Sequence, residues 1–148
     1  MSIIPIARKR MEETGNTQQW INGYPQESII RSDIEKEYGY LLCSSVGEVV
    51  GYFYFAIEED ATYSYIEGKW LNNEPYGVVH RLAANGKAKG MASHCFNWCF
   101  SQCSNLRVDT HEKNVIIRHI LEKEGFSYCG TIYVSNGTPR RAYQKKKV

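Results

Sequence analysis

The 148-residue sequence lacks the features of several large protein classes. No apolar run approaches the ~20 residues needed to cross a bilayer, and there is no internal repeat, linker or low-complexity block. The net charge of +2 carries no global signature of nucleic-acid binding, and the lysine run at residues 145–147 is typical of a solvated tail. We therefore expect one domain over residues 1–148, with neither nucleic acid nor a membrane as a partner.

The cysteine pattern excludes the common thiol motifs. The five cysteines include no Cys-x-x-Cys pair, and their number is odd. Cys95, Cys99 and Cys103 follow at four-residue spacing, which places them on one face of a helix. A metal site there would need a ligand from a second element, whereas free cysteine is among the most buried residue types. We expect core thiols and no metal; with no signal-peptide pattern in residues 1–6, we expect a cytoplasmic protein.

Apolar spacing and turn residues divide the chain into helices and strands. Helices are expected over residues 3–13, 28–38, 89–102 and 114–124, and strands over residues 40–46, 49–57, 76–84, 106–110, 126–134 and 140–146. Residues 58–75 are expected to be irregular. This order predicts an α+β fold, in which a mixed sheet carries helices on its faces.

Residues 80–92 hold the most informative pattern. An apolar strand runs into a short basic turn with glycine, and a segment with helical spacing follows at once. The first amides of a helix have no partners within it, and its dipole places positive charge there. Gly90 and Ala92 let an anion approach the backbone, while Lys87 and Lys89 add charge. The pattern predicts a site for the pyrophosphate of a nucleotide-containing cofactor.

Together with the order of elements, this turn makes the chain resemble the GNAT superfamily of acetyl-coenzyme A-dependent N-acetyltransferases. Residues 87–92 match the family loop (Arg/Gln)-x-x-Gly-x-(Gly/Ala), with Lys at the first position. Asn114 and the pair Gly125 and Phe126 stand where the family has an Asn and a closing Gly-Phe. The resemblance covers nearly the whole chain. It implies a mostly antiparallel sheet with a V-shaped split between two central strands and about four flanking helices, here without the family's first edge strand.

The resemblance implies that acetyl-coenzyme A is the co-substrate. The backbone of the strand before the loop would pair with the pantetheine arm, and an N–H near Leu82 would polarise the thioester oxygen. Asn114 would bond the pantetheine amides, with a helix N-cap as its alternative role. The full set of implied binding residues is Leu82, Ala84, Gly86, Lys87, Ala88, Lys89, Gly90, Met91, Ala92 and Asn114.

Acetyl transfer to an amine also needs a base. His80 lies on the expected cleft strand, and histidine side chains titrate near neutral pH; a structural histidine is the alternative. Glu74 and His111 are further candidates for the base.

The leaving thiolate raises a separate question. Many family members carry a Tyr four residues before the closing Gly, which protonates the thiolate; this chain has Leu121 there. Tyr128 and Tyr133 are candidate donors, with core packing as the alternative, or the thiolate leaves unassisted.

Aromatic residues beside polar amides suit a pocket for the acceptor, with core or lid packing as the alternative. The candidates are Trp20, Tyr24, Trp70 and Tyr76.

We expect an enzyme that acetylates an amine of a small molecule or a protein. The alternative, suggested by Leu121, is a non-catalytic module of the same fold that binds or senses acyl-coenzyme A. A Rossmann fingerprint, with three glycines after the first strand, is absent. The oligomeric state stays open, a homodimer included.

Overall fold

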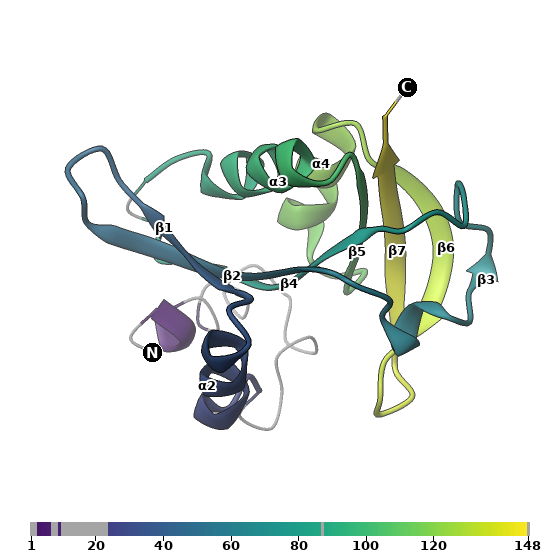
Figure 1. Cartoon of the computed structure of the whole chain (residues 1–148), viewed down its shortest axis with the longest axis horizontal. Helices are drawn as coiled ribbons and strands as arrows, with labels where there is room; N and C mark the ends of the chain where they lie inside the picture. Colours follow the sequence, from purple (N-terminus) through teal and green to yellow (C-terminus); the bar gives the residue numbers. More distant parts are fainter. Residues whose placement is uncertain (1–2, 7–8, 10–23, 87, 148) are drawn as a thin grey trace.

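A seven-stranded sheet organises the molecule, which the computed structural model describes for residues 3–6, 9, 24–86 and 88–147. The strands lie in the order β1-β2-β4-β5-β7-β6-β3 (Figure 1). Their bounds are β1 (Gly39–Cys43), β2 (Val49–Ile57), β3 (Glu67–Gly68), β4 (Gly77–Ala84), β5 (Asn105–Thr110), β6 (Ser127–Tyr133) and β7 (Pro139–Lys146). Neighbouring strands are antiparallel except β4 and β5, which run parallel. The predicted α+β class is confirmed.

Helices cover both faces of the sheet. One face carries α3 (Met91–Gln102) and α4 (Val115–Lys123); α2 (Glu27–Glu35) and the helical residues 3–6 lie on the other (Figure 1). A 3₁₀ turn, η1 (Ala61–Tyr63), follows β2. Within the described residues, no helix combines the length and apolar character needed to cross a membrane.

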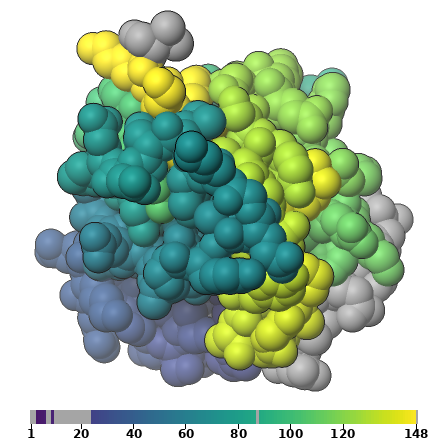
Figure 2. All heavy atoms as spheres, turned by 90° about the vertical axis from the view of Figure 1, so that its right-hand side faces the viewer, coloured from purple at the N-terminus to yellow at the C-terminus, as the bar shows by residue number. Residues whose placement is uncertain are grey.

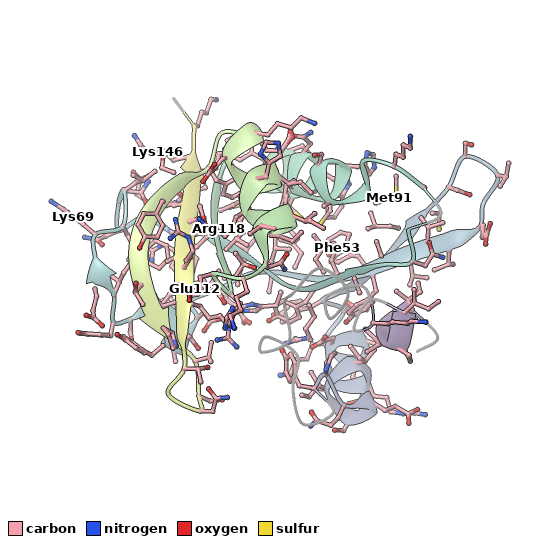
Figure 3. All side chains as sticks on the ribbon, turned by 180° about the vertical axis from the view of Figure 1, so that it is seen from behind. Phe53, Lys69, Met91, Glu112, Arg118 and Lys146 are labelled. Atoms are coloured by element: carbon pink, nitrogen blue, oxygen red, sulfur yellow. The ribbon has the colours of Figure 1, made fainter. Side chains whose placement is uncertain are left out.

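The main core fills the space between the sheet and the helices α3 and α4. Phe53 packs there against Trp98, with ring centroids 5.9 Å apart (Figure 3). Cys95 and Cys99 are 0% exposed in the same core, which confirms that these thiols are packing residues. Burial of one large apolar side chain stabilises the fold by about 1.5–3 kcal/mol, so this face fixes α3 firmly on the sheet.

Local details differ from the sequence expectation at α2 and β3. The second helix was expected to reach residue 38, but Glu37 adopts a left-handed conformation (φ 62°), which ends α2 earlier. Residues 67–68, expected to be irregular, pair with β6 as an edge strand. The segment between β2 and β4, teal in Figure 2, thereby lies beside β6 at one end of the molecule. Of the helix expected over residues 3–13, residues 3–6 and 9 are helical and the others lie outside the described residues.

The two central strands separate along their length. Within the described residues, β4 and β5 pair only at Gly77–Leu106 and Val78–Arg107. On its other side β4 carries a bulge, because His80 pairs with Tyr54 and Ala83 with Tyr52, which leaves Arg81 and Leu82 opposite one residue of β2. Arg81 has φ 53° at this point. A bulge bends and twists its strand, so β4 turns away from β5 and opens the expected V-shaped split.

Candidate active site

Two cavities meet where β4 leaves β5. One, which we call the split cavity, has a volume of about 600 Å³ and is lined from β4, β5, the segment before η1 and the β6–β7 turn. The other, the loop cavity, has about 330 Å³ and lies between the end of β4, the start of α3 and one side of α4. Leu82, Asn114 and Ile117 line both cavities. The two cavities therefore lie side by side at the β4 bulge and share part of their wall.

The loop cavity collects the predicted cofactor residues. Its lining includes Leu82, Ala84, Gly86, Ala88, Lys89, Gly90, Met91, Ala92 and Asn114, while Lys87 lies outside the described residues. Ile116, Ile117 and Ile120 of α4 add an apolar wall, and none of the described lining residues is acidic. Asn114 lines the cavity and is the N-cap of α4, the alternative role expected for it, since its Oδ1 accepts from the Ile117 amide at 3.3 Å.

The start of α3 is shaped for a close approach by an anion. Gly90 is the N-cap residue with φ 74°, and nothing lies within 4 Å of the position that a Cβ would occupy there. Glycine supplies this left-handed turn without strain, and the following amides point out of the helix N-terminus. A pyrophosphate at this end of the loop cavity and an extended amide chain along β4 and α4 fit the residues present.

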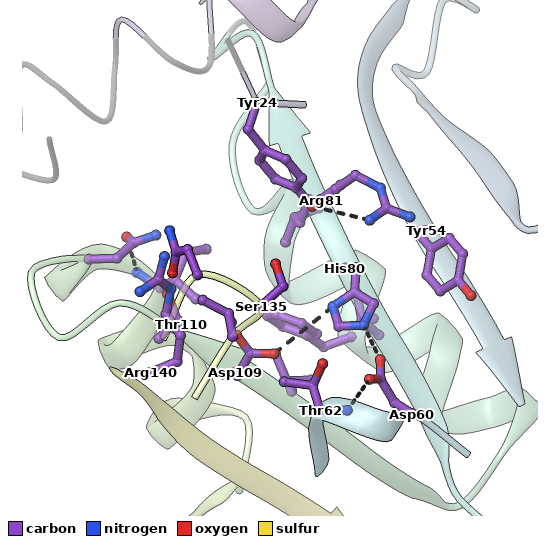
Figure 4. Close-up of a pocket in the computed structure, with 18 of the residues that line it drawn as sticks. Tyr24, Tyr54, Asp60, Thr62, His80, Arg81, Asp109, Thr110, Ser135 and Arg140 are labelled. Carbon is purple, nitrogen blue, oxygen red and sulfur yellow. Dashed lines mark hydrogen bonds and ion pairs between the residues drawn. The ribbon is translucent and has the colours of Figure 1, made fainter. Parts of the chain in front are cut away.

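His80 stands in the split cavity between two carboxylates. Its Nε2 lies 2.7 Å from Oδ2 of Asp60, and its Nδ1 lies 4.0 Å from Oδ2 of Asp109 (Figure 4). Asp60 also accepts from the Thr62 amide at 2.9 Å, and Asp109 accepts from the Tyr63 hydroxyl at 2.6 Å. The hydrogen bond to Asp60 thus orients the imidazole, and the Asp109 carboxylate lies on its other side.

The ionisation of Asp60 follows from these contacts. Burial acts to raise the pKa of this carboxyl, but the hydrogen bond and charge of His80, with the bonds from Thr62, outweigh burial and hold the pKa below its ordinary value. The ionised Asp60 carboxylate accepts a hydrogen bond from Nε2–H of His80. Nδ1 is then the basic nitrogen, and a proton taken up there would face Asp109.

A second network fixes the wall of the split cavity. Arg81 donates from Nε and Nη2 to the two oxygens of Asp33 at 2.8 and 2.6 Å, and from Nη1 to the Tyr24 hydroxyl at 3.2 Å. The Tyr52 hydroxyl donates to the same Asp33 carboxylate at 2.7 Å. Burial acts to lower the pKa of Arg81, but Asp33 and Tyr24 outweigh it and raise the pKa, so the guanidinium stays charged. The network ties α2 to the β4 bulge and places Tyr24 in the cavity.

The structure places Trp70 and Tyr76 away from both cavities. Their rings lie on the guanidinium of Arg107, at 4.2 and 4.1 Å from the ring centroids. Trp70 Nε1 donates to the carbonyl of Tyr63 at 3.0 Å, and Tyr76 is 8% exposed. Packing around a buried cation therefore accounts for these two aromatic residues, which were predicted to contact the acceptor.

The predicted acid–base residues other than His80 also lie elsewhere. Glu74, His111, Tyr128 and Tyr133 line neither cavity. Tyr128 is 50% exposed and carries the guanidinium of Arg141 over its ring at 4.1 Å. Leu121 is 0% exposed in the main core. Trp20, predicted to contact the acceptor, lies outside the described residues.

The residues that surround His80 were missed from the sequence. Asp60 belongs to a stretch expected to be irregular, 20 positions before His80, and it follows two other acidic residues that compete for the same role. Asp109 and Arg140, which also line the split cavity, come from β5 and β7. Among the described residues, no group of three or more His, Cys, Asp or Glu side chains is arranged to hold a metal ion.

No protein-family model and no curated protein matches this sequence, but solved structures do. A GNAT-family acetyltransferase from Streptococcus agalactiae 2603 is 35% identical, with a TM-score of 0.89 over 100% of this chain and 88% of that one. A GNAT-family acetyltransferase from Listeria monocytogenes 4b F2365 is 17% identical, with a TM-score of 0.69 over 99% and 86%. A chain of the NatC complex bound to Gag peptide and CoA is 12% identical, with a TM-score of 0.62 over 99% and 91%. The last two structures, at 17% and 12% identity, show only that this chain has the same fold.

Proposed function

Since the chain belongs to the GNAT family of acetyltransferases, we propose that it is an N-acetyltransferase that moves an acetyl group from acetyl-coenzyme A to a primary amine of a small molecule or protein. This proposal rests chiefly on Leu82, which lines both cavities and lies two residues along β4 from His80. The loop cavity and the cavity that holds His80 are thus adjacent.

The loop cavity would hold acetyl-coenzyme A. The amides after Gly90 and the charge of Lys89 would bind its pyrophosphate, and the backbone of Leu82 and Ala84 with the Asn114 side chain would bind its amide-bearing arm. When bound, it supplies an acetyl thioester whose carbon–sulfur bond breaks with its electron pair on sulfur. A thiol with a pKa near ~8.5 is a fair leaving group, so the buried Leu121 does not prevent the reaction.

His80 would serve as the general base. A free amine has a pKa near ~10 and is mostly protonated at neutral pH, so it must lose a proton to react. With Nε2–H donating to Asp60, Nδ1 of His80 accepts that proton while the amine nitrogen gains the acetyl group. Asp109, 4.0 Å from Nδ1, stabilises the imidazolium. A base in this position contributes typically ~10²–10⁴-fold.

The β4 bulge would polarise the acetyl carbonyl. The bulge turns the peptide groups of Arg81 and Leu82 out of the ladder with β2, and Leu82 lines both cavities. An amide donor aimed at a developing oxyanion is worth about 3 kcal/mol. The Arg81–Asp33 pair holds this backbone in place.

A non-catalytic module that binds acyl-coenzyme A is the second candidate, because Leu121 replaces the usual acid with a buried apolar side chain. Thiol release from acetyl-coenzyme A, measured with a panel of amines, separates the two functions. Amine-dependent release, with the N-acetyl product identified by mass spectrometry, supports the enzyme. A thermal shift with acetyl-coenzyme A but no amine-dependent release would support the binding module instead.

A further inference from the structure

Arg140 is a buried cation on the wall of the split cavity. It lies at the start of β7, is 6% exposed and lines the cavity. Its Nη1 donates to the Thr138 hydroxyl at 3.0 Å and to the Pro139 carbonyl at 2.9 Å. In residues 3–6, 9, 24–86 and 88–147, no carboxylate lies within 4.0 Å of its guanidinium, and neither Nε nor Nη2 has a hydrogen-bond partner.

The acidic groups nearby do not compensate this charge fully. Asp109 attracts Arg140, but its carboxylate already accepts from Tyr63 at 2.6 Å and faces Nδ1 of His80. Burial lowers the pKa of Arg140, and Asp109 and Tyr24 offset only part of that effect. Buried arginines in folded proteins are normally paired with a carboxylate or a phosphate, because an unpaired buried charge is strongly unfavourable.

The other arginine of the cavity has its partner within the protein. Arg81 holds the Asp33 carboxylate through two hydrogen bonds. The split cavity therefore has two differently charged ends: Asp60 beside His80 at one, and Arg140 at the other. Figure 4 shows Asp109 between Arg140 and His80, with Ser135 facing the same space.

We infer that the acceptor is a small molecule that carries a carboxylate as well as its amine, as a free amino acid does, and that Arg140 binds the carboxylate while the amine faces His80. This inference rests on the proposed function and narrows it to one substrate class. The planar guanidinium can donate two parallel hydrogen bonds to a carboxylate, and its Nε and Nη2 are the two groups left for that purpose. A primary amine without a carboxylate would leave Arg140 buried and unpaired.

The test is a binding comparison in the presence of coenzyme A. Calorimetry measures the dissociation constants of the twenty proteinogenic amino acids, of their carboxamides and of the available decarboxylated amines. For at least one side chain, the amino acid should bind about 10- to 100-fold more tightly than its two counterparts, since a charge-assisted hydrogen bond is lost with the carboxylate. Equal binding of all three forms, or no binding by any amino acid, overturns the inference.

Matched variants assign the preference to Arg140. Arg140→Gln should abolish the difference between amino acid and carboxamide, and Arg141→Gln should keep it. Arg141 is the adjacent residue, and it lies against Tyr128 outside both cavities. Should Arg140→Gln fail to fold, Arg140→Lys keeps the charge but not the planar fork, and it should retain only part of the preference. If Arg140→Gln or Arg140→Lys keeps the full preference for the amino acid, the assignment to Arg140 is contradicted.

Turnover, followed separately as N-acetyl product, distinguishes this inference from the proposed function. One outcome is carboxylate-dependent binding that is lost in Arg140→Gln, with no product from any amine. It would support the binding of a carboxylate by Arg140 and contradict the acetyltransferase function. The other outcome is equal product formation from amino acids and carboxamides, in the wild type and in Arg140→Gln. It would support the acetyltransferase function and overturn the binding of a carboxylate by Arg140.

Discussion

Removal of the Asp33 carboxylate should destabilise the protein and weaken the amine site at the same time. Asp33 is 4% exposed and accepts hydrogen bonds from Arg81 Nη2, the Tyr52 hydroxyl and Arg81 Nε at 2.6, 2.7 and 2.8 Å. Asp33→Ala would leave the guanidinium of Arg81 buried without its carboxylate. It would also release the β4 bulge from α2, because this pair is the ionic link between the two elements in the described part of the chain.

The expected magnitude comes from the burial of both partners. Breaking a buried ion pair from one side costs about 3–5 kcal/mol, chiefly through the charge left behind. For a domain of this size the melting temperature should fall by roughly 10–20 °C. Asp33→Ala combined with Arg81→Ala leaves no orphaned charge, so the double variant should lose at least ~2 kcal/mol less than the sum of the single variants.

Urea unfolding followed by circular dichroism measures these free energies. Arg31→Ala is the matched control, since Arg31 pairs with Glu27 on the exposed side of α2 and such a pair contributes at most about 0.5 kcal/mol. In kinetic assays Asp33→Ala should raise KM for the amine. Arg81, which donates to the Tyr24 hydroxyl, would no longer be held in position by Asp33, so Tyr24 would lose its orientation in the cavity. The variant's Kd for acetyl-coenzyme A should stay within about threefold, under ~1 kcal/mol. A loss below ~1 kcal/mol in Asp33→Ala, or strict additivity in the double variant, would contradict a stabilising role for this ion pair.

Gly90→Glu should abolish the thermal shift with acetyl-coenzyme A, whereas Gly90→Ala should keep it at a cost of about 1–2 kcal/mol in stability, because φ is 74° but the space is open; a wild-type shift in Gly90→Glu would mean that the pyrophosphate binds elsewhere. Asn114→Ala should lower the unfolding free energy, measured with urea, by about 1 kcal/mol through the lost helix cap, and should weaken the binding of acetyl-coenzyme A in calorimetry. An unchanged Kd would mean that Asn114 serves only as a helix cap. The lowered pKa of Asp60 makes its stabilising contribution present at neutral pH and lost as the pH falls through that pKa. Asp60→Asn should therefore lower the unfolding free energy at pH 7 and approach the wild type in acid, and a difference independent of pH would contradict this. Trp20→Ala should raise KM for the amine and leave the Kd of acetyl-coenzyme A within about threefold; loss of cofactor binding in the folded variant would move Trp20 to the other site.

The loop cavity could be predicted from the sequence because its parts are close in the chain. The strand, the turn and the first residues of α3 span residues 80–92, so glycine spacing and helix-start physics locate them without knowledge of the fold. Asn114 was found only through the resemblance, because its position depends on how α4 meets β4.

The split cavity could not be predicted in the same way, because its contacts join distant parts of the chain. Asp60 lies 20 positions from His80, and Asp33 lies 48 positions from Arg81. No local sequence pattern indicates which carboxylate lies beside His80 or beside Arg81. Trp70 and Tyr76 show the converse: aromatic residues near a cleft strand suit a ligand pocket, yet the fold uses their faces to cover Arg107.

His80 is the proposed base for acetyl transfer to an amine in the split cavity. The most direct measurement is the pH dependence of kcat/KM for N-acetyl product formation in the wild type, His80→Ala and His119→Ala, the last an exposed histidine of α4. We expect His80→Ala to lower kcat/KM by ~10²-fold or more and to lose the acidic limb of the profile, while His119→Ala matches the wild type. An unchanged pH profile in His80→Ala would contradict this role.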